Sequence, residues 1–351
     1  MTIITKFIWL KKIHYYMEYD FGIRLEMGSQ VGSGHFYRCL ALSKELRKHG
    51  GKVIFLVSNK KKLAKHITGN VPFYVVRGKS EKDFVNHCFK LSKNIKVFIF
   101  DLPFHNELYS KKFENHDKTV VIDDLGNKTI YSKVLFNGSI IEKFYKYKLK
   151  DSKTRKFFGP KYMILREDFL KKRSYTKIKS NSIKKILLTF GGNDEQNMTK
   201  KILYALLKKK FDVSVVLGPT YLQKKRLIDS AKQYSNLHIE SNVKNMAKLI
   251  YKQDLVISRP GITTYELACL GIPTLLIPSS RPQNLLAQKM QKNGFGLNYG
   301  YWDNDFSRLD NFLSQLDDYR VRKNMHNFGK KMVDGKGLFR VSKILLSLLK
   351  K

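Results

Sequence analysis

Short apolar runs and helix-patterned stretches alternate along most of the chain. Lys52–Val57, Lys96–Asp101 and Thr119–Asp124 are almost continuously apolar up to their last residues. Strands buried on both faces have this pattern, and they occur mainly in parallel sheets. Between them, apolar residues recur at helical spacing, for example over residues 81–91. The alternation predicts an α/β fold in which helices cover both faces of a parallel, doubly wound sheet.

The alternation occurs twice. In the first half it predicts strands at 23–27, 52–57, 71–76, 96–101, 119–124 and 134–137, and helices ending at Gly50 and covering 81–91 and 108–115. In the second half it predicts strands at 185–190, 213–217, 238–239, 255–258 and 273–278, and helices at 197–208, 224–233, 245–253 and 283–293, one ending at Gly271, and two or three over 311–351. The two halves therefore resemble two similar doubly wound domains in tandem.

The length of 351 residues suits two domains of ordinary size. Residues 172–182 are polar and basic without a clear hydrophobic period, which indicates a linker. We therefore expect an extension of unknown role at 1–20, an N-terminal domain at 21–175 and a C-terminal domain at 176–351. The last helix is expected to return to the N-terminal domain.

A glycine-rich turn follows the first predicted strand and opens a helix. Its sequence, residues 28–39, contains Gly32 and Gly34 directly before His35. Free backbone N–H groups at such a helix start favour anions. A dinucleotide fingerprint would need a third glycine where Tyr37 stands, so NAD or FAD binding is disfavoured. His35 is a candidate acid or base because an imidazole titrates near neutral pH, although a lone histidine here is more often a capping or packing residue.

Acidic side chains end two of the predicted strands. Asp101 closes one strand, and Asp123 and Asp124 close the next. In parallel sheets, ligands bind at the carboxyl ends of the strands, where we also expect His35. Asp123 and Asp124 have three open interpretations: binding a cation, orienting His35, or capping the following turn.

The second half contains two further glycine turns. Gly191-Gly192-Asn193 follows a strand and lets backbone approach a bound group closely. Gly261, Thr263 and Thr264 open a helix that suits a diphosphate, and Glu266 could accept hydrogen bonds from a ribose. Thr263 and Glu266 also have the spacing of a capping box, which the motif alone favours.

The chain is strongly basic, with 67 Lys and Arg against 29 Asp and Glu and a net charge of +38. Only 14 of these basic residues are Arg, and they are scattered. Specific nucleic-acid binders favour Arg and concentrate charge on one face, so no specific nucleic-acid partner is expected. Solvated lysine-rich surface is the favoured interpretation, with weak attraction to an anionic membrane surface left open.

The three cysteines are an odd number without paired spacing, which indicates buried thiols in a reducing, cytoplasmic compartment. Residues 1–19 are too short to span a bilayer and show no clear cleavage site. Asp303 and Asp305 form a weak metal pair in a polar loop, and His66, His87 and His116 lack partners at metal spacing. No metal and no cofactor is expected.

Five motifs in order resemble the UDP-sugar hydrolases of pseudaminic acid synthesis, whose substrate is UDP-2,4-diacetamido-2,4,6-trideoxy-β-L-altropyranose. The resemblance covers roughly residues 22–300, and the order of the motifs is more specific than any one of them. The motifs are residues 28–42, Val121–Leu125, Phe158–Tyr162, Leu188–Asp194 and Gly261–Pro273.

The resemblance implies a GT-B fold, with two Rossmann-like doubly wound domains facing across a cleft, related to the transferase that makes lipid II. It implies that His35 is catalytic, that the C-terminal domain binds UDP, that the sugar faces the N-terminal domain and that no metal is needed. A neutral imidazole could deprotonate the attacking water. The predicted substrate-binding residues are Gly32, Gly34, Arg38, Asp101, Asp123, Gly191, Gly192, Asn193, Gly261, Thr263, Thr264, Glu266 and Gln283.

Three departures from the family pattern concern mainly the sugar. The family has Asp-x-Tyr where this chain has Asp101-Leu-Pro-Phe104, Asn-Gln where it has Pro282-Gln-Asn284, and small residues where it has Arg259-Pro260. Two rivals to the hydrolase are therefore kept: a GT-B glycosyltransferase with a UDP-sugar donor, and a non-catalytic nucleotide-sugar binder. Oligomeric state and stereochemical course are left undetermined.

Overall fold

The structure is a computed structural model. It describes residues 17–26, 34–58, 71–178, 180–192, 196–209, 211–218, 224–241, 245–301 and 306–350, together with 194, 221 and 243. Most of the glycine-rich turn, Asn193, His66 and the pair Asp303 and Asp305 lie outside these residues.

The chain divides into two compact units. Unit 1 takes in residues 35–164, the strand before them and the chain from residue 337 onward, whereas unit 2 takes in residues 165–336. The change between units at 164/165 precedes the linker expected at 172–182, because a helix, α6, already occupies Glu167–Arg173. Phe169 in α6 is completely buried, and Arg173 at the end of the helix donates to the backbone carbonyls of Cys269 and Lys330.

Unit 1 is built on a parallel sheet with the strand order β3-β2-β1-β4-β5-β7-β9. Its strands are β1 (Tyr19–Leu25), β2 (Val53–Val57), β3 (Phe73–Val75), β4 (Ile95–Asp101), β5 (Thr119–Ile122), β7 (Val134–Asn137) and β9 (Arg155–Phe158), and a second small sheet pairs β6 (Lys128–Ile130) with β8 (Tyr147–Leu149). The helices are α2 (Gly34–Lys48), α4 (Glu81–Lys90), α5 (Asn106–Lys112), α14 (Gly337–Ser347) and the 3-10 turns Ser92–Asn94, Glu142–Tyr145 and Pro160–Tyr162.

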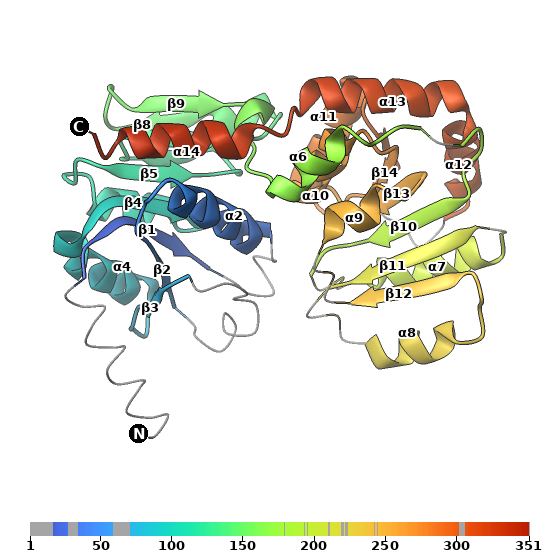
Figure 1. Ribbon diagram of the computed structural model, residues 1–351, viewed down its shortest axis with the longest axis horizontal. Helices are drawn as coiled ribbons and strands as arrows, with labels where there is room; N and C mark the ends of the chain where they lie inside the picture. Colours follow the sequence, from blue (N-terminus) through green and yellow to red (C-terminus); the bar gives the residue numbers. More distant parts are fainter. Residues whose placement is uncertain are drawn as a thin grey trace. The chain divides into compact units, whose positions relative to one another are not determined.

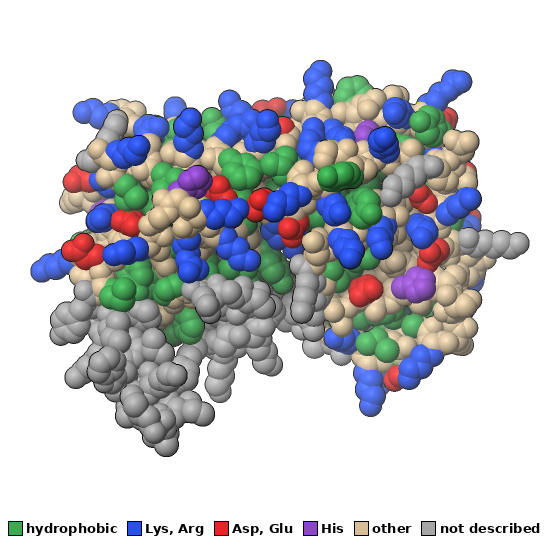
Figure 2. Space-filling view, viewed as in Figure 1, with side chains coloured by type: hydrophobic (Ala, Val, Ile, Leu, Met, Phe, Trp, Pro, Cys, Tyr) green, Lys and Arg blue, Asp and Glu red, His purple; other side chains and the backbone are tan. Residues whose placement is uncertain are grey.

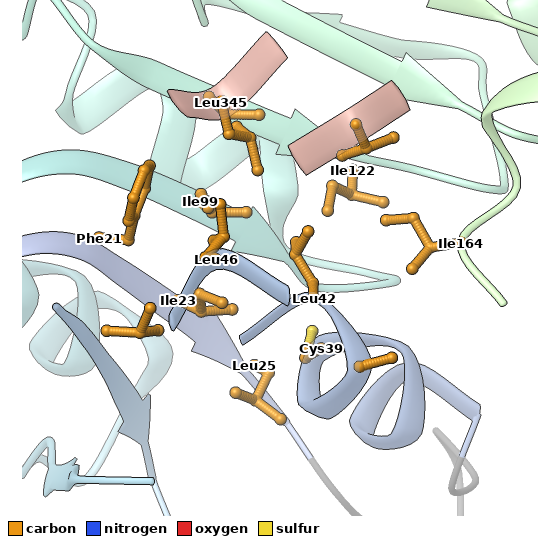
Figure 3. Close-up of a cluster of buried hydrophobic side chains, with 14 of the residues drawn as sticks. Phe21, Ile23, Leu25, Cys39, Leu42, Leu46, Ile99, Ile122, Ile164 and Leu345 are labelled. Carbon is orange, nitrogen blue, oxygen red and sulfur yellow. The ribbon is translucent and has the colours of Figure 1, made fainter. Parts of the chain in front are cut away.

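Helices cover both faces of this sheet (Figure 1). On one face, α2 and α14 close a core that includes Phe21, Leu42 and Leu345 (Figure 3). On the other, α4 and α5 pack over Phe98 and Phe100. The C-terminal helix α14 is therefore part of the unit 1 core, although unit 2 precedes it in the sequence.

Unit 2 repeats the arrangement with the parallel order β12-β11-β10-β13-β14-β15. Its strands are β10 (Lys185–Thr189), β11 (Asp212–Leu217), β12 (Leu237–Ser241), β13 (Leu255–Ser258), β14 (Thr274–Leu276) and β15 (Leu297–Asn298). Its helices are α6, α7 (Met198–Leu207), α8 (Lys224–Ala231), α9 (Met246–Ile250), α10 (Ile262–Leu270), α11 (Arg281–Lys292), α12 (Leu309–Asp317) and α13 (Tyr319–Met332).

The predicted fold class, an α/β protein with two parallel, doubly wound domains, is confirmed. Local capping explains several boundaries: Ser80 accepts a hydrogen bond from the Asp83 N–H and starts α4, and Gly271, at φ +67°, ends α10. The first strand begins at Tyr19 rather than Ile23, so the end of the expected extension belongs to the sheet.

Besides the two-residue strand β15, three strands were missing from the prediction. The basic segment 148–161 contains β9, in which Phe157 packs on one core and Phe158 on the other. The small sheet of β6 and β8 was also unpredicted. These strands have three or four residues, too few for a recognisable period.

Basic side chains are spread over the visible face of the molecule and alternate with acidic and neutral ones (Figure 2). This scatter agrees with the expected solvated lysine-rich surface. In the part of the chain that the structure describes, no helix is both long and apolar enough to cross a membrane.

Candidate active site

Both sheets reverse their strand order at one point. Successive connections run from β1 outward to β3 and then return to β4 on the other side of β1; in unit 2 the same reversal lies between β10 and β13. At such a switch point the loops diverge and leave a crevice outside the carboxyl ends of the strands, where doubly wound folds bind ligands. In unit 1 the side chains at this position are titratable.

His35 and Asp101 meet at the unit 1 switch point. His35 lies in the first turn of α2, after β1, and Asp101 is the last residue of β4. His35 Nδ1 and Asp101 Oδ1 are 2.6 Å apart. Asp101 is completely buried, whereas the His35 side chain keeps 14% of its surface exposed. The imidazole is thus held by a buried carboxylate and remains partly exposed to solvent.

Arg38, one helical turn after His35, lies beneath the same carboxylate. Its Nε donates to Asp101 Oδ2 at 2.6 Å and its Nη2 donates to Oδ1 at 2.5 Å. Burial alone would raise the pKa of Asp101, but the Arg38 guanidinium and His35 together hold that pKa well below its usual range. Asp101 is therefore a carboxylate at any pH at which the protein would work.

These contacts determine which nitrogen of His35 carries a proton. If Nδ1 were unprotonated, its lone pair would face a carboxylate oxygen at 2.6 Å, so Nδ1–H must donate to Asp101. Arg38 Nη2 is also close to Nδ1, at 3.0 Å, because both groups donate to the same oxygen. In the neutral ring, Nε2 then has a free lone pair on the exposed side.

Arg38 and Asp101 were predicted to bind substrate. Asp101 has no exposed surface and both of its oxygens are engaged, with Cys39 Sγ adding a contact at 3.1 Å. Arg38 is 3% exposed and is taken up by Asp101 and Asp124. Both residues contact His35 from its buried side, and substrate binding by either of them stays a prediction.

Asp123 and Asp124 separate into different environments. Asp123 Oδ2 accepts from the backbone N–H of Leu125 and Gly126, at 3.1 and 2.7 Å, and Lys128 binds Oδ1 at 2.5 Å. The turn-capping interpretation describes these contacts, and substrate binding by Asp123 stays a prediction. Asp124, in contrast, joins the His35 cluster through Arg38 Nη1, which donates to its Oδ2 at 2.5 Å.

A second polar cluster, unpredicted from the sequence, lies at the same end of unit 1. Ligand atoms of Glu26, Glu81 and His105 lie within 4.8 Å of one another, a spacing that could hold a metal ion. However, the fully buried Arg24 donates to Glu26 Oε1 at 2.6 Å and to the Tyr109 hydroxyl at 2.8 Å. The guanidinium already supplies the positive charge, so these contacts describe an ion-pair network.

In unit 2 the switch point is formed mainly by glycines and an arginine. Gly191, two residues after the end of β10, has φ +85°, and a methyl group on it would lie 2.8 Å from Arg259 Nη2. A methyl group on Gly218 would lie 2.1 Å from the Gly192 carbonyl oxygen. These positions need glycine because backbone and the Arg259 guanidinium pass so close. The result is bare backbone beside a positive charge.

The start of α10 differs from the predicted capping box. The helix begins at Ile262 with Gly261 as its N-cap, so Thr263 lies inside the first turn. Thr264 Oγ1, not Glu266, accepts from the N-cap N–H, at 3.1 Å. Glu266 instead pairs with Arg166 at 3.0 Å, and its side chain is 10% exposed. The capping-box interpretation of Thr263 and Glu266 is therefore wrong.

Gln283, in the first turn of α11, accepts two hydrogen bonds from Ser279, from the backbone N–H and the hydroxyl, both at 2.9 Å. Gly34 starts α2. Gly32 and Asn193 lie outside the described residues, so their assignments stay predictions. The sequence identified Asp124 as one of two residues that could orient His35 and Arg259 only as a departure from the family pattern, and neither was included among the predicted substrate-binding residues. The acidic pair and the unusual residue before Gly261 were visible signals for them.

Comparison with known proteins identifies the fold of the chain. Residues 176–336 match the glycosyltransferase family 28 C-terminal domain. The chain also resembles the solved structure of MurG from Acinetobacter baumannii, with a TM-score of 0.65 and 14% identity over 93% of this chain and 99% of that one. The chain has the GT-B fold. A Medicago truncatula protein of this fold, solved with UDP-glucose, gives a TM-score of 0.60 at 12% identity, over 94% of this chain and 98% of that one.

Two relatives extend the likeness to sequence. An uncharacterised protein of Methanocaldococcus jannaschii is 35% identical over 263 residues, which are 71% of this chain and 53% of that protein. This GT-B chain thus matches only about half the length of that relative. The spore coat polysaccharide biosynthesis protein SpsG of Bacillus subtilis is 28% identical over 93% of this chain and 98% of its own length.

Proposed function

We propose that this protein is a hydrolase that releases UDP from a UDP-linked 2,4-diacetamido-2,4,6-trideoxy sugar, of the kind used in pseudaminic acid synthesis. Water attacks the anomeric carbon and His35 is the general base. The observation that carries the proposal is the 2.6 Å contact between His35 Nδ1 and Asp101, which leaves Nε2 as an exposed proton acceptor. The identity of the sugar rests on the resemblance of the five motifs alone.

Unit 1 supplies the base in this proposal. A buried carboxylate that fixes the tautomer of a histidine and stabilises its protonated form is a recurring device for proton abstraction. Arg38 keeps Asp101 ionised, so the carboxylate is always ready to stabilise the imidazolium that forms when water loses its proton.

Unit 2 supplies the nucleotide site. The free N–H groups at the start of α10, the bare backbone at Gly191 and the Arg259 guanidinium all suit a diphosphate. The same groups would stabilise the negative charge that develops on UDP as its bond to the sugar breaks. The match of residues 176–336 to a glycosyltransferase domain and the UDP-glucose bound by the Medicago truncatula protein support a UDP-sugar as the ligand.

A glycosyltransferase with a UDP-sugar donor is the second candidate. The match to the glycosyltransferase family 28 domain favours it. In that case His35 would take the proton of an acceptor hydroxyl instead of water. Both reactions use the same base and the same leaving group, so only the nucleophile distinguishes them.

The test measures UDP release from UDP-2,4-diacetamido-2,4,6-trideoxy-β-L-altropyranose without any acceptor. We expect release by the wild type and a loss of about 10³-fold in kcat for His35→Ala, the usual size of a general-base contribution, with UDP still bound. His49→Ala is the matched control, because His49 follows the same helix and is 57% exposed. UDP binding without release would favour the transferase, and equal release by His35→Ala would remove His35 from its role.

A further inference from the structure

We propose that Asp124 is a positioning residue that holds the attacking water against His35, and that this pair selects water over an alcohol as the nucleophile. The inference rests on the proposed function, which it deepens, because it identifies the chemical feature that would make this GT-B site hydrolytic. It concerns residues of unit 1 only.

The Asp124 carboxylate has one satisfied and one unsatisfied oxygen. Arg38 Nη1 donates to Oδ2 at 2.5 Å. Oδ1 is buried and has no hydrogen-bond partner among the described residues. The side chain as a whole keeps 24% of its surface exposed, so it stands at the edge of the cluster and not under it. Water can reach the exposed part of this side chain, whereas Oδ1 itself is shielded from solvent.

The distance to His35 fits one bridging water. His35 Nε2 and Asp124 Oδ2 are 4.0 Å apart, which is too far for a direct hydrogen bond. A water that donates one hydrogen to each of two acceptors at about 2.8 Å spans about 4.4 Å between them, because its two O–H bonds diverge by about 105°. The observed separation is close to that span.

Both groups present acceptors at this point. Nε2 has a free lone pair because Nδ1–H donates to Asp101, and the Asp124 carboxylate offers oxygen acceptors beside Arg38. A water held in this way directs both hydrogens into the protein. Its lone pairs then point outward, toward an electrophile.

The balanced step follows from this arrangement. The water oxygen forms a bond to the anomeric carbon while the bond from that carbon to the UDP oxygen breaks, and the electron pair leaves with UDP. One water proton moves to His35 Nε2. The other stays on the oxygen, held by Asp124, and becomes the hydrogen of the new sugar hydroxyl.

An alcohol meets the same pair differently. Its single O–H would point to His35, and its carbon would occupy the position of the second water hydrogen, beside the Asp124 carboxylate. That contact places an apolar group against a charge and removes the second hydrogen that water would donate to Oδ2. Asp124 thus favours water because only water supplies two hydrogens.

The experiment measures how the variants divide substrate between water and methanol. Wild type, Asp124→Asn and Asp124→Glu are given the UDP-sugar in buffer with a fixed methanol concentration, and mass spectrometry gives the ratio of methyl glycoside to free sugar. This ratio does not depend on the folded fraction. Asp151→Asn is the matched control. Asp151 pairs at 2.8 Å with Lys133, which directly precedes β7 and so lies at the amino ends of the strands, away from the carboxyl ends where Asp124 lies.

For Asp124→Asn we expect kcat for hydrolysis to fall by about 10²-fold, as for a misplaced nucleophile, with KM within about twofold because UDP binding is untouched. The ratio of methyl glycoside to free sugar should rise at least about fivefold, as for loss of one hydrogen bond, and Asp124→Glu should restore part of the water preference. An unchanged ratio, or a loss confined to KM, overturns the Asp124 proposal while leaving the hydrolase intact. No UDP release by the wild type overturns both.

Discussion

The two units have the same strand order and differ in what stands at their switch points. In unit 1, helix α2 carries His35 in its first turn and buries Arg38 against Asp101, so the carboxyl end of the sheet presents a titratable cluster. In unit 2, the corresponding turn after β10 begins with Gly191 and lies against Arg259. The same topology therefore carries titratable side chains at one switch point and glycine backbone beside an arginine at the other.

The difference shows that the fold determines where a ligand can bind, and that the burial of side chains determines which chemistry is available there. A carboxylate that is completely buried against a guanidinium cannot serve a ligand, but it can hold an imidazole in one tautomer. Glycine residues have no side chain that could move protons, but their backbone can approach a phosphate closely. If this division is correct, substitutions in unit 1 should change kcat, and substitutions in unit 2 should change UDP affinity.

The largest effect is expected for Asp101→Asn. The amide would donate to His35 Nδ1 and force the proton onto Nε2, which removes the base, so kcat should fall by about 10³-fold or more with UDP affinity unchanged. Loss of the buried partner of Arg38 should also lower the free energy of unfolding by about 3 kcal/mol. Kinetics, UDP titration and urea unfolding measure these quantities. Activity close to that of the wild type would show that His35 does not depend on this contact.

Arg259→Met should weaken UDP binding by about 30-fold, the size expected for a lost charge-assisted hydrogen bond. Calorimetry with UDP and with uridine separates the two parts of the ligand, because uridine lacks the diphosphate. Lys232→Met is the control, as Lys232 is 74% exposed and precedes β12 at the other edge of the sheet. An equal loss for uridine would show that Arg259 acts on the base or ribose.

Gly191→Ala should weaken UDP binding by about tenfold, because the methyl group would lie 2.8 Å from Arg259 Nη2 and the guanidinium would have to move. Positive φ by itself costs an alanine about 1 kcal/mol in stability. Gly50→Ala isolates that cost, since Gly50 has φ +83° and nothing within 4 Å of an added methyl group. If both variants bind UDP normally, Gly191 is not part of the nucleotide site.

The smallest effect is expected at the thiols, which are buried in both units. Burial raises the pKa of Cys269 to about 11 and that of Cys88 to about 12, and it raises the pKa of Cys39 well above its usual value. At pH 8 the native protein should therefore resist iodoacetamide, whereas the urea-unfolded chain should be alkylated at all three positions. Mass spectrometry of intact protein counts the adducts. Rapid labelling of the native form would contradict the burial of that cysteine.

The sequence pattern predicted the alternation of strands and helices, the two parallel sheets and the position of His35 and Asp101 at strand ends. It did not predict the use of the acidic residues. Asp101 meets Arg38 and His35 across 63 and 66 residues of sequence, and Arg38 reaches Asp124 across 86. The local hydrophobic pattern cannot predict which of the two adjacent carboxylates, Asp123 or Asp124, contacts a partner so far away in the sequence.

Taken alone, the sequence determined the elements and their class, because burial on two faces requires continuous apolar runs and helices require a repeating apolar stripe. Only the tertiary structure decided the chemistry at the switch points. It enclosed Asp101 with Arg38 and set Nε2 of His35 4.0 Å from Asp124. Burial and ion pairing determine whether a polar side chain supports the fold or faces a ligand, and both depend on contacts between residues far apart in the chain.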